Sequence, residues 1–228
     1  MDKGTLYIVA TPIGNLDDMS IRAVEVLKEV DIIACEDTRH SGHLFKKYAI
    51  SGKLTPYHDH NKVQAAPRLV KQLVEGSDIA LVTDSGTPGV SDPAYVLVNK
   101  AIENGVTVVP IPGACAAIAA ISASGMPSDR FSFEGFLPTK DGKRRKRLDE
   151  IKEDPRTLIF YESPYRVMKT LRQIHEQLGD RRCAIARELT KIHEEIIRGT
   201  LEELIGQLAD VKTRGEYVII VEGLRASD

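Results

Sequence analysis

The stretch of sequence with the clearest chemical potential is IALVTDSGTPGVSDP, residues 79–93. It runs from apolar residues into a loop with Gly86 and Gly89, a pattern typical of loops that hold nucleotide-like ligands. The loop contains no lysine, Pro88 removes one backbone N–H, and Asp84 would repel an anion, so a phosphate-binding loop is disfavoured. The residue types favour a ligand that carries a ribose, an amine or an adenine; the alternative is a tight turn that binds nothing.

A second group, Glu36, Asp37 and Arg39, stands directly after another apolar run. Side chains at the carboxyl ends of strands line the ligand crevice of a parallel α/β sheet, and carboxylates there could orient a hydroxyl and take its proton. The structural alternative is that Asp37 or Thr38 caps the helix that follows, with Arg39 paired to a carboxylate. We therefore treat these side chains as catalytic candidates with that alternative open.

His58 and His60 form a third group, in the stretch YHDHN. Residues at i and i+2 of an extended segment share one face, so both imidazoles could serve acid–base chemistry or RNA binding, with Asn61 beside them. No third ligand follows at a recognisable spacing, so we expect no metal site; a solvated loop is the alternative. A fourth stretch, YESPYR, ends a predicted strand, and its polar side chains could also activate or orient a hydroxyl. The alternative is that Ser163 caps a helix with Pro164 at its first position.

The run KDGKRRKR, residues 140–147, places six basic side chains in eight positions. We expect a loop that leads into a helix and binds the phosphate backbone of a nucleic acid; a solvated, mobile loop is the alternative. Aromatic residues make up only 5% of the chain, so broad stacking on single strands is not indicated, although Tyr57, Tyr161 or Tyr165 could hold one base. The net charge of −2 gives no general attraction to nucleic acid, so such a partner would meet a local patch.

Helices and strands must position these groups, and their places can be predicted from the sequence. Apolar and amphipathic segments alternate along the chain, which is typical of a parallel sheet covered by helices. In the first half we expect strands over residues 6–10, 31–35, 79–83 and 106–111, and helices over 20–29, 41–48, 62–74 and 92–103. Beyond residue 112 we expect strands over 131–135, 156–161, 183–188, 195–199 and 217–222, and helices from 114 and over 143–152, 164–177 and 201–208. A direct strand-to-strand step across LTKIHEE indicates antiparallel pairing. The sequence therefore predicts two α/β domains, 1–112 and 113–228.

The cysteines Cys35, Cys115 and Cys183 are widely spaced and do not form a disulfide framework, which is typical of a reducing compartment. No apolar run is long enough to span a bilayer, and the N-terminal segment is interpreted as a first strand rather than a secretion signal. We therefore expect a cytoplasmic protein without a membrane partner.

Seven blocks of the sequence occur together in a fixed order: TPIGNLDDMSIRAVEVLKEVDIIACEDTRHSGHLF, YHDHN, LVTDSGTPGVSDP, PIPGACAAIAA, FEGFLP, FYESPYR and ARELTKIHEE. Together they closely resemble the bacterial small-subunit ribosomal RNA (cytidine-2′-O)-methyltransferases of the tetrapyrrole-methylase superfamily. The resemblance implies an N-terminal α/β domain with a mostly parallel sheet, a C-terminal α/β domain with a mixed sheet, and S-adenosylmethionine in the cleft between them. It also implies a homodimer that methylates the ribose 2′-hydroxyl of a cytidine in the RNA of an assembled or nearly assembled small subunit.

The same resemblance carries roles to individual residues. The superfamily's Gly-Asp-Pro cofactor motif falls on residues 86–88, so Thr87 replaces the aspartate and Asp84 could meet the charged end of the cofactor instead. The Pro-Gly-x-Ser element falls on residues 112–115, where Cys115 replaces the serine. The implied cofactor contacts are Pro12, Asp84, Ser85, Gly86, Thr87, Pro88, Val90, Ala114, Cys115, Tyr161 and Ala186. The implied catalytic residues are Glu36, Asp37, Arg39, His58 and His60, and the implied RNA contacts are Lys143, Arg144, Arg145, Lys146, Arg147 and Asn61.

Other functions stay open on the sequence alone. A superfamily relative could methylate a tetrapyrrole carbon or a modified protein histidine, although the basic run and the YHDHN stretch count against a tetrapyrrole. The chain could also bind the cofactor without catalysis, as a ribosome assembly factor. A phosphate-binding enzyme is disfavoured by the missing lysine.

Overall fold

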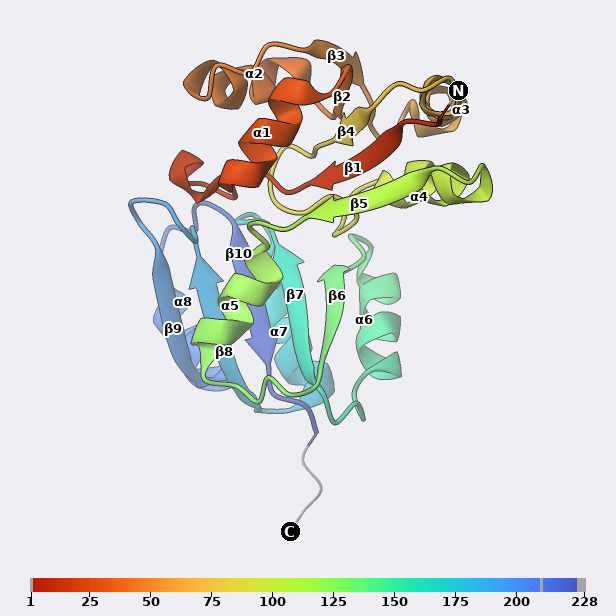
Figure 1. The fold of residues 1–228 in the computed structure, drawn as a ribbon. Coiled ribbons are helices and arrows are strands. Elements are labelled where there is room, and N and C mark those ends of the chain that lie inside the picture. Colours follow the sequence, from red (N-terminus) through yellow and green to blue (C-terminus); the bar gives the residue numbers. More distant parts are fainter. Residues whose placement is uncertain (1, 210, 225–228) are drawn as a thin grey trace. The chain divides into compact units, whose positions relative to one another are not determined.

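The structure is a computed structural model that describes residues 2–209 and 211–224 (Figure 1). Contacts within the chain divide it into two compact units, and the boundary in the sequence lies between Cys115 and Ala116. The expected assignment of domains to residues 1–112 and 113–228 stays a prediction. Each unit is described below by itself.

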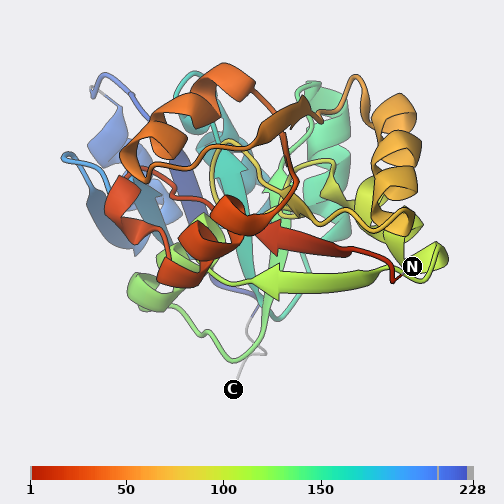
Figure 2. The same cartoon turned by 45° about the horizontal axis from the view of Figure 1, so that its top comes forward.

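Unit 1 contains a five-stranded parallel sheet in the order β3-β2-β4-β1-β5. Its strands are β1 (Thr5–Val9), β2 (Ile32–Cys35), β3 (Lys53–Pro56), β4 (Ile79–Leu81) and β5 (Thr107–Ile111). Figure 2 shows β1 and β5 running side by side, as their register requires. The helices are α1 (Ile21–Glu29), α2 (Thr38–Lys47), α3 (Lys62–Val74) and α4 (Ala94–Glu103), with a short 3-10 helix η1 (Leu16–Asp18).

Helices cover both faces of the unit 1 sheet, as the apolar central strands predict. One core cluster packs α1 and α2 against one face, through side chains such as Leu27 and Phe45. The other packs α3 and α4 against the opposite face, through side chains such as Leu69 and Leu97. The expected parallel α/β sheet is confirmed.

Strand β3 is missing from the sequence prediction. Its residues, KLTP, are exposed at both ends and only half-buried in the middle, so they lack the apolar run that marks the central strands. The strand lies at the edge of the sheet, where Pro56 is tolerated because its missing N–H is not needed by a further neighbour.

Unit 2 contains a mixed sheet in the order β6-β7-β10-β8-β9, in which β6 and β7 are parallel and the other pairs antiparallel. Its strands are β6 (Phe131–Phe136), β7 (Thr157–Glu162), β8 (Arg182–Arg187), β9 (Glu195–Thr200) and β10 (Tyr217–Val221). The antiparallel step from β8 to β9 confirms the pairing expected across LTKIHEE.

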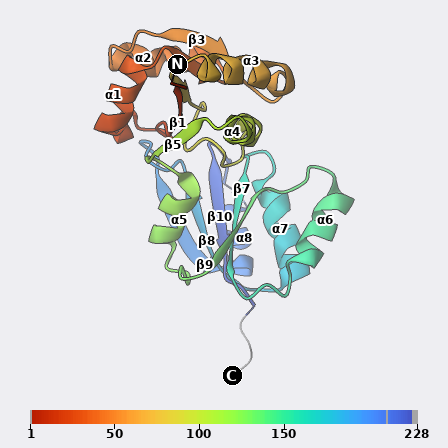
Figure 3. The same cartoon turned by 45° about the vertical axis from the view of Figure 1, so that its right-hand side comes forward.

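The helices of unit 2 are α5 (Ala116–Ser124), α6 (Asp141–Glu150), α7 (Val167–Leu178) and α8 (Leu201–Leu208). Figure 3 shows α5 on one side of the sheet and α7 on the other. The main core of the unit joins α6, α7 and α8 to the sheet, through residues such as Leu148, Leu171 and Leu204.

The expected start of α7 is wrong. Ser163 does not cap the helix with its side chain; its carbonyl accepts the N–H groups of Arg166 and Val167, and the helix begins only at Val167. The buried Glu162 carboxylate accepts the N–H of Ser163 at 2.7 Å and binds Arg166, so the preceding strand controls this turn.

Candidate functional site

The polar groups singled out in the first half of the sequence gather beyond one edge of the unit 1 sheet. The neighbouring strands β3, β2 and β4 are parallel, so their carboxyl ends lie at the same edge. Glu36 follows β2, His58 follows β3 and Asp84 follows β4. The N–H of Tyr57 donates to the carbonyl of Cys35 at 2.8 Å, which holds the first two segments together.

Glu36 is the centre of a hydrogen-bonded network at this edge. Its Oε2 accepts the Thr83 hydroxyl at 3.0 Å and the Asp84 N–H at 3.4 Å, and Asp84 Oδ1 accepts the N–H of Asp37 at 3.2 Å. Burial is the main cause that raises the pKa of Glu36; the hydrogen bonds lower it, and the negative charges of Asp84 and Asp92 raise it again. A fixed carboxylate with a raised pKa can accept a proton from a hydroxyl.

A cysteine nucleophile is disfavoured at this edge. Burial raises the pKa of Cys35 to about 11, and the nearby negative charges of Asp84 and Asp37 act in the same direction. The thiol is therefore protonated at neutral pH, and a protonated thiol is a poor nucleophile.

Asp37 and Arg39 adopt the structural alternative that the sequence left open. Asp37 is the N-cap of α2 and accepts the N–H of Arg39 at 2.8 Å. The Arg39 guanidinium also pairs with Asp37 at 3.4 Å, and its side chain is exposed. The same geometry leaves the guanidinium at the surface, where it can reach an anionic substrate.

The YHDHN stretch forms a braced turn. Asn61 accepts the N–H of His58 at 2.9 Å and donates to the carbonyl of Pro56 at 2.9 Å, so its amide orders the turn; an RNA contact from Asn61 stays a prediction. The rings of His58 and His60 meet edge to face, with centroids 6.1 Å apart. Nδ1 of His58 is buried and has no hydrogen-bond partner among the described residues. Across the same ranges, no group of three His, Cys, Asp or Glu side chains could hold a metal ion.

The glycine loop after β4 is tied to the end of β1. Thr11 donates its N–H to the carbonyl of Gly86 at 2.9 Å and accepts the Gly86 N–H at 3.1 Å, and its hydroxyl donates to the carbonyl of Thr83 at 3.0 Å. Gly86 has a φ of +87°, and a Cβ there would lie 3.4 Å from the Ile13 side chain. Glycine is therefore favoured here by the backbone conformation, whereas the space beside it would accept a Cβ in ordinary contact.

Thr87, at the position of the superfamily aspartate, ties the loop to the segment before α5. Its hydroxyl donates to the carbonyl of Ala114 at 2.9 Å. Asp92 holds the far end of the loop, where it accepts the N–H groups of Gly89 and Ala94 at 2.8 Å. Burial raises the pKa of Asp92, the hydrogen bonds from Ala94 and Gly89 partly offset this, and the charge of Asp59 adds to it. These contacts hold the loop in a fixed shape, and they engage the Thr87 hydroxyl within the protein.

Tyr161 and Ala186, the two predicted cofactor residues of unit 2, lie on one face of its sheet. Both pair with Val218 of the central strand β10, and directly opposed residues point to the same face. The Tyr161 hydroxyl accepts the N–H of Ala117 at 3.0 Å. Its ring packs edge to face against Phe133 and Phe136, which fixes its orientation.

The basic run enters helix α6 as expected, although the helix begins at Asp141 rather than at residue 143. The prediction that Arg144 contacts RNA is wrong. Arg144 is only 1% exposed. Its guanidinium donates to Gln173, to the Pro138 carbonyl at 3.3 Å and to Asp141 at 2.7 Å. The helical period turns this position inward, so Arg144 joins α6 to α7 from inside the unit.

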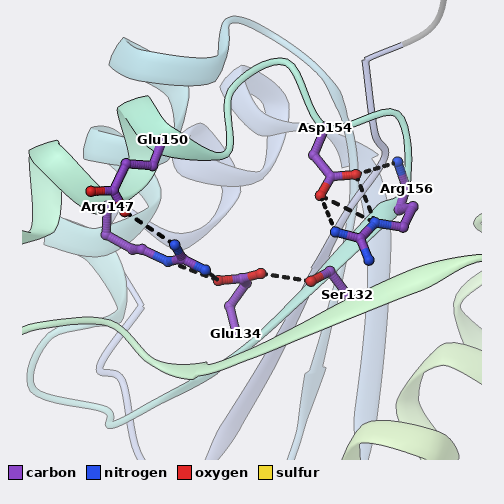
Figure 4. A network of polar contacts seen from close by, with 6 residues as sticks. All are labelled: Ser132, Glu134, Arg147, Glu150, Asp154 and Arg156. Atoms are coloured by element: carbon purple, nitrogen blue, oxygen red, sulfur yellow. Dashed lines mark hydrogen bonds and ion pairs between the residues drawn. The ribbon is translucent and has the colours of Figure 1, made fainter.

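The other arginines of the run are also held by carboxylates. Arg145 pairs with Glu176 at 2.8 Å. Figure 4 shows Arg147 between Glu134 and Glu150, at 2.6 and 3.1 Å, with the Ser132 hydroxyl on the second oxygen of Glu134. The lysines of the run differ from its arginines. Lys140, Lys143 and Lys146 are exposed and make no ion pair with any residue in the described ranges.

The tyrosines proposed to hold a base have very different surroundings. Tyr57 is 1% exposed and donates its hydroxyl to the carbonyl of Pro93, so its predicted role in stacking is wrong. Tyr161 is half-buried between two phenylalanines. Tyr165 is 95% exposed. Thr11 and Thr83 were not among the predicted site residues, although both stand shortly after the apolar runs of β1 and β4.

Comparisons with known proteins agree with this architecture. The family model described as Tetrapyrrole (Corrin/Porphyrin) Methylases matches residues 5–205. A relative from Halalkalibacterium halodurans is 52% identical over 97% of this chain and 77% of its own. Another from Pseudomonas aeruginosa is 49% identical over 100% of this chain and 82% of its own. Both carry the name ribosomal RNA small subunit methyltransferase I.

Solved structures with lower identity share the fold. A diphthine synthase is 16% identical and superposes with a TM-score of 0.73 over 96% of this chain and 90% of its own. A uroporphyrin-III-C-methyltransferase from Thermus thermophilus is 20% identical, with a TM-score of 0.64 over 96% and 94%. The glycine loop, the strand order and these matches lead to one conclusion: the chain belongs to the tetrapyrrole methylase family, and within it to the group of ribosomal RNA small subunit methyltransferases I.

Proposed function

We propose that the protein transfers a methyl group from S-adenosylmethionine to the ribose 2′-hydroxyl of a cytidine in small-subunit ribosomal RNA. The observation that carries this proposal is the bridge between Thr11 and Gly86, which holds the glycine loop directly beside the Glu36 network. A ligand loop and a proton acceptor thus stand at one edge of the unit 1 sheet. The names of the relatives support ribosomal RNA of the small subunit as the substrate.

The residues of the glycine loop fit S-adenosylmethionine better than a phosphate ligand. Carboxylates surround the loop, at Glu36, Asp84 and Asp92, and the loop itself lacks a basic side chain. Negative charge favours a cationic sulfonium and amine and opposes a phosphate. The proposed contacts are Pro12, Asp84, Ser85, Gly86, Thr87, Pro88, Val90, Ala114, Cys115, Tyr161 and Ala186. When bound, the cofactor supplies a methyl group on positively charged sulfur, so no metal ion is required for the transfer.

The protein must orient the hydroxyl and remove its proton. Glu36 would take the hydroxyl proton as the ribose oxygen accepts the methyl group that the bound cofactor supplies. Thr83 and the Asp84 N–H hold Oε2 of Glu36, which leaves Oε1 for the substrate. Asp37, Arg39, His58 and His60 would orient the RNA around it. Positioned proton transfer of this kind contributes roughly 100- to 10,000-fold to a rate.

RNA phosphates would meet α6 through its lysines. Lys143 and Lys146 keep their predicted role and Lys140 joins them, whereas Arg145 and Arg147 already have carboxylate partners. The substrate would be an assembled or nearly assembled small subunit, in the cytoplasm, with the enzyme acting as a homodimer. No helix in the described ranges is long and apolar enough to cross a membrane.

Methyl transfer to purified ribosomal subunits tests the proposed function. Small subunits from a strain that lacks the enzyme are incubated with the protein and cofactor labelled in the methyl group. We expect label in the RNA of the small subunit and none in large subunits. Binding of the cofactor without transfer to any assembly stage would support the assembly-factor alternative, and transfer only to a tetrapyrrole or a protein would support another member of the family.

A further inference from the structure

Three segments of unit 2 leave its sheet side by side: residues 163–166, 188–194 and 211–216, which we call the rim. Tyr217, the first residue of β10, pairs with Glu162 at the end of β7 and with Arg187 at the end of β8. The segments that adjoin these three residues therefore start from neighbouring positions at one edge of the sheet. The sequence assigned no shared role to them.

Hydrogen bonds join the rim into one connected surface. Lys191 binds Glu188 at 2.8 Å and Glu216 at 2.9 Å, and Glu188 also donates its N–H to the carbonyl of Glu216 at 3.0 Å. The hydroxyl of Thr213 donates to the carbonyl of Pro164 at 2.8 Å, which fastens the third segment to the first. A surface with these cross-links can present side chains in fixed positions.

The rim holds strained backbone. Glu188 and Thr190 have φ values of 51° and 67°, in the left-handed region that side-chain-bearing residues rarely occupy. Gly215 has a φ of 79°, and a Cβ there would lie 2.3 Å from the Glu188 carboxyl group. Strain of this kind costs free energy, persists only where surrounding contacts enforce it, and clusters at functional sites.

The rim exposes two large apolar side chains and two cations that no carboxylate binds. Tyr165 and Ile192 are 95% and 97% exposed. Lys212 and Arg214, on either side of Thr213, are exposed and make no ion pair with any residue that the structure describes. The acids of the rim are engaged, because Glu188 and Glu216 share Lys191 and Glu194 accepts the N–H of Thr190. The cations of the rim that no carboxylate binds, Lys212 and Arg214, therefore lie together in its third segment.

We propose that the rim binds a single-stranded segment of the RNA substrate, with a base stacked on Tyr165 and phosphates at Lys212 and Arg214. The proposal rests on the RNA substrate proposed above. An exposed aromatic ring beside cations is the combination by which proteins bind unpaired nucleotides, because every base has a face to stack and every nucleotide a phosphate.

Fluorescence anisotropy with a labelled single-stranded RNA dodecamer, measured over a range of salt concentrations, tests the rim. Tyr165→Ala should weaken binding about 5- to 100-fold, whereas Tyr165→Phe, which keeps the ring, should bind like the wild type. Lys212→Gln with Arg214→Gln should reduce the slope of log affinity against log salt by about 1.4, at roughly 0.7 for each phosphate contact. Matched controls are Tyr95→Ala on α4, and Arg22→Gln with Lys28→Gln on α1, all exposed and distant in sequence.

The truncated side chains are exposed, so thermal unfolding of each variant should match the wild type. Wild-type affinity and salt slope in the rim variants would overturn the proposal. A changed sedimentation coefficient with unchanged RNA binding would also overturn it and would make the rim a contact between copies. The methylation assay keeps the two proposals apart. If the wild-type protein methylates small subunits and the rim variants bind RNA normally, only the proposal about the rim is refuted. If the wild-type protein binds RNA through Tyr165 but methylates none, only the proposed reaction is refuted.

Discussion

At the residue scale, Glu36 shows what residue types can and cannot predict. Its place after an apolar run marked it as a group at a strand end, and the structure places it there. The partner that fixes it, Thr83, follows a different strand 47 positions away. That contact depends on β2 and β4 being neighbours, and strand order cannot be derived from residue types alone. The same limit hid the buried, inward position of Arg144.

The raised pKa of Glu36 predicts an acid limb in the pH profile of methyl transfer. The base form exists only above that pKa, so kcat/KM, which reports the ionisation of the free enzyme, should fall as the pH is lowered through it, at a pH above the usual range of a glutamate. Glu36→Gln should lower kcat about 100- to 10,000-fold and abolish the limb. Thr83→Val removes a hydrogen bond that lowers this pKa, so the limb should move to higher pH, while Thr83→Ser should leave it in place. An unchanged limb in Glu36→Gln would assign it to another group.

The same pKa direction fixes the sign of an effect on stability. Because the folded-state pKa of Glu36 is raised above its unfolded value, ionised Glu36 opposes folding. This cost is absent below the unfolded pKa, grows as the pH rises to the folded pKa, and is complete at neutral pH. Glu36→Gln should therefore have a higher Tm than the wild type at neutral pH, with the difference shrinking in acid. A lower Tm at neutral pH would show that the carboxylate is needed for folding.

At the scale of elements, the central strands and the amphipathic helices could be predicted from the sequence. Their buried positions carry apolar residues at the spacing typical of each element. The range of α8 was predicted to the residue, and in the structure a capping box formed by Thr200 and Glu203 marks its start. Edge strand β3 could not be predicted, because KLTP buries too little to carry a pattern. The start of α7 was misplaced because the buried Glu162, rather than a Ser163 cap, controls that turn.

Substitutions in the glycine loop should distinguish the effect of backbone strain on stability from the effect of ligand contact on cofactor binding. Gly86→Ala and Gly125→Ala both place a side chain at a positive φ, so each should lose about 1 kcal/mol of stability. Only Gly86 lies in the loop that we assign to the cofactor, and a Cβ at Gly125 would meet nothing within 4 Å. In calorimetric titration with S-adenosylmethionine, Gly86→Ala should weaken binding and Gly86→Arg should abolish it, while Gly125→Ala binds normally. Equal binding by all these variants would remove the loop from the cofactor site.

Helix α6 predicts that its lysines and arginines behave differently. Lys140, Lys143 and Lys146 changed together to Gln should lower the salt slope of binding to small subunits by roughly 2, at about 0.7 per contact. Arg145→Gln with Arg147→Gln removes the same kind of charge, but these side chains already have carboxylate partners. That variant should keep the slope but lose stability, because the Glu134 carboxylate that Arg147 binds is only 5% exposed and would be left without a counter-charge. If the salt slope of binding falls equally in both variants, the lysines and the arginines of α6 do not differ in their contacts with RNA.

At the scale of the whole molecule, the α/β class and the family could be predicted because separate blocks of sequence agreed in order and spacing. The parallel sheet of unit 1 and the mixed sheet of unit 2 confirm that class. The rim of unit 2 could not be predicted in this way. Its three segments are joined only through the pairing of Tyr217 with two distant strands, and the segments have no shared motif.

The central claim is that the methyl group is transferred to a ribose oxygen of cytidine. It is tested most directly by nucleoside mass spectrometry of small-subunit RNA, after reaction of subunits that lack the modification with the wild-type protein. The account predicts 2′-O-methylcytidine as the new nucleoside, absent when Gly86→Arg replaces the wild type. A methyl group on a base, on another nucleoside, or only on a ribosomal protein would contradict it.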